Sequence, residues 1–120
     1  MTDAAVSISQ TDIATLEQLY IFRGRTEILQ FLDKYPFLIP VLLEAPEKIH
    51  HYFPDSQLFL EVVPDAEIID WIHLILSILI TLDPHEAVAK LHQLDEDWSI
   101  GLSHQVHQLF FTTLEYPDEF

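Results

Sequence analysis

The sequence has 120 residues, 49% of them hydrophobic, and its 20 acidic side chains against five basic ones give a formal net charge of −15 at pH 7. This length and composition predict one folded domain, residues 1–120. The charge disfavours binding to nucleic acids and to anionic membrane surfaces, so we expect neither as a partner. The absence of cysteine excludes disulfides and cysteine metal sites, and it suits a reducing cytoplasm.

The N-terminal half predicts helices. Residues 1–10 contain neither the basic region nor the apolar core of a signal peptide, and we expect them to form a flexible leader. Residues 11–23 and 26–34 carry apolar side chains at helical spacing. Three prolines then divide residues 36–53, which predicts short helical turns that restart at each proline, because proline is tolerated at a first helical position but not in a helix interior.

Alternating apolar side chains in the second half predict three strands. Residues 58–63 alternate between two faces, and residues 71–82 have one wholly apolar face and one mixed face, which is typical of a central strand. We expect residues 64–70 between these two strands to form a turn or short loop, and a last strand is predicted at residues 109–116. The sequence therefore predicts an α+β fold, in which N-terminal helices are followed by the order strand–strand–helix–strand. We expect a small, mainly antiparallel three-stranded sheet covered by helices on one face.

The strongest local signal predicts a helix over residues 83–98. The carboxylate of Asp83 can accept hydrogen bonds from the first-turn amides, and Pro84 has the φ angle that a first helical position requires. Asp95, Glu96 and Asp97 then fall in the last turn, at the negative end of the helix dipole. The alternating oxygens and central glycine of a calcium loop are missing around them, so these carboxylates form either a solvated helix end or the contact site of a basic partner. We regard them as the candidate partner-binding residues.

Four segments of the chain carry a resemblance to a known family. They are residues 31–45 (FLDKYPFLIPVLLEA), 60–65 (LEVVPD), 82–87 (LDPHEA) and 95–98 (DEDW). The chain resembles, over about residues 27–116, a family of small, uncharacterised bacterial proteins that is common in cyanobacteria. The four motifs are caps, turns and core segments, so the resemblance implies no activity and no site residue.

The seven histidines are the chain's candidates for chemistry. His104 and His107 have helical spacing, but a transition-metal site needs three or four converging ligands, and no pattern here supplies the others. His73 and Ser77 are too far apart along one strand to form a nucleophile and its base. We therefore expect no metal, no cofactor and no catalytic residue. The alternative is a small hydrolase-like enzyme that uses His73, His104 or His107 with a carboxylate.

Charge and size together favour a non-enzymatic protein-interaction module. Acidic surfaces attract basic partners over long distances, so an antitoxin-like or inhibitory partner of a basic protein suits this chain. A further alternative is a self-assembling subunit, because a small sheet with apolar residues on both faces needs a cover.

Overall fold

The structure of the chain, a computed structural model, describes residues 8–117. Most of the predicted leader, residues 1–7, lies outside the described residues. Ile8 is buried, and the hydroxyl of Ser9 accepts a hydrogen bond from the backbone N–H of Asp12 at 3.0 Å. Ser9 thereby caps the first helix, α1 (Gln10–Leu19).

The described residues form a sheet of four strands in the order β1-β2-β3-β4. β1 pairs with β2 in parallel, β2 with β3 antiparallel, and β3 with β4 in parallel. The expectation of three mainly antiparallel strands is therefore wrong, because the sheet is mixed and has one strand more. The bounds are β1 (Ile21–Arg23), β2 (Leu58–Pro64), β3 (Ile72–Leu79) and β4 (Phe110–Glu115).

The additional strand explains the main error in the N-terminal half. The helix predicted over residues 11–23 ends at Leu19, and Ile21–Arg23 pairs with β2 instead. Three residues are too few to show a strand periodicity. Gly24 follows with a φ of 92°, a left-handed conformation that glycine adopts without steric cost, and it turns the chain from β1 into the next helix.

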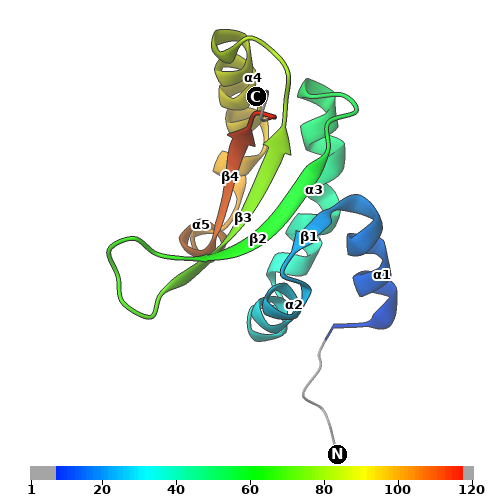
Figure 1. Cartoon of the computed structure of the whole chain (residues 1–120), viewed down its shortest axis with the longest axis vertical. Coiled ribbons are helices and arrows are strands. Elements are labelled where there is room, and N and C mark those ends of the chain that lie inside the picture. Colours follow the sequence, from blue (N-terminus) through cyan, green and yellow to red (C-terminus); the bar gives the residue numbers. More distant parts are fainter. Residues whose placement is uncertain (1–7, 118–120) are drawn as a thin grey trace, which may run out of the picture.

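The helices cover one face of the sheet, as the sequence predicts (Figure 1). Each parallel pair of strands is joined through helices, and the antiparallel hairpin β2–β3 links the two pairs. No helix within residues 8–117 is long and apolar enough to cross a membrane. The bounds are α2 (Arg25–Lys34), α3 (Leu38–Tyr52), α4 (Pro84–Asp97), the 3₁₀ turn η1 (Ser99–Gly101) and α5 (His104–Leu109).

The core lies between the helices and the facing side of the two central strands. Leu60 of β2 and Leu74, Leu76 and Ile78 of β3 are inaccessible to solvent, and Leu42 of α3 is equally buried. This confirms that the wholly apolar side of β3 faces inward from Leu74 onward, whereas Ile72 at the start of the strand is exposed. The opposite side of the sheet, which we call the open face, carries none of the helices of residues 8–117 (Figure 1).

Helix α3 runs without a break through Pro46, so the prediction of separate short turns is wrong. Because proline has no N–H, the carbonyl oxygen of Leu42, four residues earlier, loses its usual helical donor. The hydroxyl of Tyr20 donates a hydrogen bond to this oxygen at 2.6 Å. Burial raises the pKa of the Tyr20 hydroxyl, which therefore remains protonated as a donor. A side chain that follows α1 thus completes the hydrogen bonding of α3.

The cap of α4 is as predicted. The carboxylate of Asp83 accepts hydrogen bonds from the backbone N–H groups of His85 at 3.0 Å and Glu86 at 3.4 Å, and Pro84 is the first residue of the helix. The start of α4 is therefore fixed by the side chain of Asp83, independently of the residues against which α4 packs in the core.

Replacing Asp83 with alanine should lower the free energy of unfolding by about 0.5–2 kcal/mol, because two first-turn N–H groups lose their acceptor. Asp83→Asn is the matched control, since asparagine keeps an acceptor oxygen and caps helices well. Chemical denaturation of the three proteins checks the prediction. Equal losses for Ala and Asn would show that the hydrogen bonds of the cap are not the stabilising feature.

Candidate interaction surfaces

The predicted partner-binding residues Asp95, Glu96 and Asp97 lie in the last turn of α4 and are all exposed. Asp95 accepts a hydrogen bond from the hydroxyl of Ser99 in the following turn. Asp97 borders a shallow depression between α3 and α4, which also includes Lys48. The structure therefore places the three carboxylates on a solvated helix end, and their role in binding stays a prediction.

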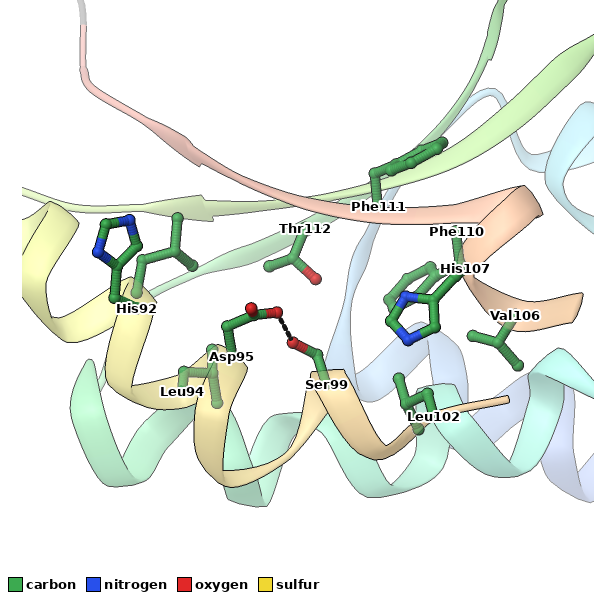
Figure 2. Close-up of a pocket in the computed structure, with 11 residues that line it drawn as sticks. His92, Leu94, Asp95, Ser99, Leu102, Val106, His107, Phe110, Phe111 and Thr112 are labelled. Atoms are coloured by element: carbon green, nitrogen blue, oxygen red, sulfur yellow. Dashed lines mark hydrogen bonds between the residues drawn. The ribbon is translucent and has the colours of Figure 1, made fainter. Parts of the chain in front are cut away.

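A cavity of about 240 Å³ lies between α4, α5 and β4 (Figure 2). The lining side chains that could take part in catalysis are those of His92, Asp95, Ser99 and His107. The hydroxyl of Ser99 is bonded to Asp95 rather than to a histidine. The serine–histidine pair of a serine hydrolase is therefore not formed at Ser99.

The three histidines of the hydrolase hypothesis do not converge. His73 lies on the open face, where its ring packs edge-on against Phe111 with the centroids 4.8 Å apart. His107 lines the cavity on the helix-covered face, beside Phe110, and Figure 2 shows Phe110 and Phe111 pointing to opposite sides of β4. The sheet thus separates His73 from His107, and His104 contacts Gln108 on the surface of α5. Within residues 8–117, no three His, Asp or Glu side chains are placed to hold a metal ion.

An ion pair crosses the open face from one edge strand to the other. The guanidinium of Arg23 in β1 donates two hydrogen bonds to the carboxylate of Glu115 in β4, at 2.8 and 2.6 Å. The same guanidinium lies 4.0 Å from the centroid of the Phe59 ring. These hydrogen bonds raise the pKa of Arg23 and lower that of Glu115, so both groups remain charged.

The centre of the open face, which the Arg23–Glu115 pair spans, is protected from solvent. The register of the sheet places Ser77 between Phe59 and Thr113, and Ser77 is only 7% exposed although no helix covers this face. Sequence reasoning assigned Arg23 to a helix and therefore missed the pair. A bidentate contact between residues so far apart in the sequence leaves no local signal.

The connection between β2 and β3 projects beyond the rest of the molecule (Figure 1). We call residues 64–72 the hairpin arm. The sequence predicts only a turn or short loop at residues 64–70, with Trp71 and Ile72 in the following strand. The arm nevertheless exposes large apolar side chains: Ile69 is 89% exposed, Ile68 58%, Ile72 41% and Trp71 37%. The available signal was the pair of adjacent isoleucines inside an otherwise polar, acidic turn.

The hairpin arm is held in shape by Asp65. The backbone N–H of Asp65 donates to the carbonyl oxygen of Trp71 at 2.7 Å, and its carboxylate accepts from the N–H groups of Glu67 at 2.7 Å and Ile68 at 2.8 Å. The other carboxylate oxygen lies 3.3 Å from Nε2 of His73. The backbone hydrogen bonds, with the nearby His73, lower the pKa of Asp65. These hydrogen bonds of Asp65 therefore fix the backbone conformation at the tip of the arm.

An aromatic row connects the arm to the open face. The rings of Trp71 and His73 pack edge-on with centroids 6.5 Å apart, and His73 in turn contacts Phe111. This row of rings extends from Phe111 on the sheet to Trp71 at the base of the arm, and Ile68 and Ile69 follow at its tip.

No family model, curated protein or solved structure matches this chain. The resemblance to the bacterial family therefore stays a prediction, and the surfaces are assessed by their chemistry alone.

Proposed function

We propose that the chain is a non-enzymatic protein-interaction module of the cytoplasm, which binds a basic protein as an antitoxin-like or inhibitory partner. The observation that carries this proposal is the charge of the second half. No lysine or arginine occurs between Lys48 and Lys90, a segment that includes β2, the hairpin arm and β3 and contains seven carboxylates. The field of such a surface accelerates the encounter with a positively charged protein.

Internal ion pairs leave the net charge unchanged, but they reduce the number of basic side chains available at the surface. Arg23 is bonded to Glu115, and Arg25 donates a hydrogen bond to Glu17 at 2.8 Å. Two of the five basic side chains are therefore already neutralised by contacts within the molecule. The hydrolase alternative has less support, since Ser99 contacts no histidine base. A self-assembling subunit would bring two equally acidic surfaces together, which costs electrostatic energy.

The association rate with a basic partner should fall as salt is raised. The screening length shrinks from about 10 Å at 0.1 M ionic strength to about 3 Å at 1 M, so long-range attraction is lost while short contacts persist. Neutralising Asp95, Glu96 and Asp97 to the matching amides should also slow association. The measurement is stopped-flow association in rising salt, with the partner captured from the host and then purified.

A charge-matched variant serves as the control for this experiment. Asp12→Asn, Glu27→Gln and Glu86→Gln remove the same three charges from other exposed or half-exposed positions. A larger effect of the α4 variant would locate the encounter surface at the end of α4, whereas equal effects would mean that only net charge matters. An association rate that is independent of salt for every variant would refute electrostatic capture and with it the proposed function.

A further inference from the structure

We propose that the hairpin arm is the docking element of this module, and that it packs against an apolar patch bordered by lysine or arginine on the partner protein. This inference rests on the proposed function and adds to it the place of contact and the chemistry of the partner's surface.

The first argument is the concentration of exposed apolar surface. Nine large apolar side chains are exposed among the described residues, and four of them fall within residues 68–72. Scattered single apolar residues are normal on protein surfaces, but four exposed ones within five residues at the end of one projecting hairpin indicate a binding site. The group also includes a tryptophan, one of the residues that contribute most to binding energy at protein interfaces.

The second argument is that the tip of the arm is already formed in the free protein. Its ends are closed by the Asp65–Trp71 backbone hydrogen bond, and the Asp65 carboxylate holds the N–H groups of Glu67 and Ile68. A loop that is ordered before binding loses less conformational entropy when it is buried. Ile68 and Ile69 therefore lie on a backbone whose conformation is already formed before a partner binds.

The third argument is charge complementarity, which identifies the occupant. Glu67 and Asp70 are exposed on either side of Ile68 and Ile69, and the arm contains no basic residue. A partner that covers the isoleucines must place its own rim against these carboxylates, so its rim should be basic. A second copy of this chain, with the same charge of −15, and an anionic membrane surface would both be repelled.

Two synthetic peptides of equal charge separate the apolar contact from simple charge attraction. The first is a 16-residue helix of leucine and lysine with the leucines on one face, and the second is an oligolysine. The arm variant is Ile68→Ser with Ile69→Ser. The control is Val88→Ser, which removes an exposed apolar side chain (44% exposed) from α4. Binding is followed by titration calorimetry and by tryptophan fluorescence, in which Trp71 is the solvent-sensitive residue because Trp98, the other tryptophan, is buried.

The arm variant should bind the leucine–lysine peptide about tenfold more weakly than the wild type, as expected for the loss of central interface residues. The Val88 control should bind like the wild type, and oligolysine should not distinguish the three proteins. The emission of Trp71 should shift to the blue only with the amphipathic peptide. Ile69→Ser alone, at the most exposed of these positions, repeats the test if the double variant is poorly folded by circular dichroism.

Several outcomes would overturn the inference. If neither peptide binds any of the proteins, the proposed function itself fails. If the leucine–lysine peptide binds the wild type and the arm variant equally, the arm is not the docking element although the proposed function stands. Arm-dependent self-association in analytical ultracentrifugation would assign the arm to a second copy. Arm-dependent binding to phosphatidylcholine vesicles would assign it to a membrane.

Discussion

Replacing Leu76 with alanine is expected to lower the free energy of unfolding by about 2–5 kcal/mol. Leu76 is inaccessible to solvent in the central strand β3, where it pairs in register with Leu60 of β2 and faces the helices. The substitution removes its methyl groups from the core and leaves a cavity that rigid neighbours on both strands cannot fill. Chemical denaturation by urea, followed by circular dichroism, measures the change.

Ile75→Ala is the matched control for this prediction, because Ile75 is the preceding residue of the same strand and points to the open face, where it is only half-buried. It should cost distinctly less than Leu76→Ala. Equal losses would mean that the open face is as tightly packed in solution as the helix-covered core. That result would contradict the one-sided sheet described here.

Replacing Tyr20 with phenylalanine should lower the free energy of unfolding by about 1–3 kcal/mol. The hydroxyl donates a hydrogen bond to the Leu42 carbonyl oxygen, to which Pro46 cannot donate because it has no N–H. Phenylalanine keeps the ring in the core but leaves that buried oxygen without a partner. The decrease in the free energy of unfolding therefore reports the cost of leaving the Leu42 carbonyl oxygen without a hydrogen bond, and not a change in packing volume.

A double-mutant cycle with Pro46→Ala tests the cause. Alanine at position 46 restores a backbone N–H within reach of the Leu42 oxygen, so Tyr20→Phe should cost clearly less in that background. Thermal and urea unfolding of the four proteins give the coupling energy. Additive effects would show that the Tyr20 hydroxyl and the proline do not compensate each other, and that α3 tolerates Pro46 for another reason.

The sequence predicted correctly those elements that depend on interactions between residues close together in the chain. Strand β2 and the two faces of β3 follow from alternation, and the start of α4 follows from Asp83 and Pro84, whose interactions lie within four residues. The covering of one sheet face by helices also follows, because an apolar strand face requires a partner layer.

The errors arise where the deciding interaction is distant or the element is short. β1 has three residues and α5 has six, so neither is long enough to show a period. The continuity of α3 through Pro46 depends on Tyr20, which is far away in the sequence. The Arg23–Glu115 pair likewise joins two edge strands that only the finished sheet brings together.

The candidate surfaces were predictable only in part. The exposure of Asp95, Glu96 and Asp97 follows from their place at a helix end. The hairpin arm was treated as a simple turn, because a sequence does not show how far a turn projects from the body of a protein. Its apolar side chains become significant only when the structure shows that no core residue covers them.

The linking of two parallel pairs through one hairpin also has a consequence for how the chain folds. Of the three strand pairings in residues 8–117, only β2–β3 joins strands with no helix between them, and the other two close loops that contain whole helices. Closure entropy grows with loop length, and pairings of high contact order form slowly. The hairpin is therefore the pairing with the lowest entropic barrier. The hairpin arm therefore belongs to the part of the sheet whose formation depends least on the pairing of β1 with β2 and of β4 with β3.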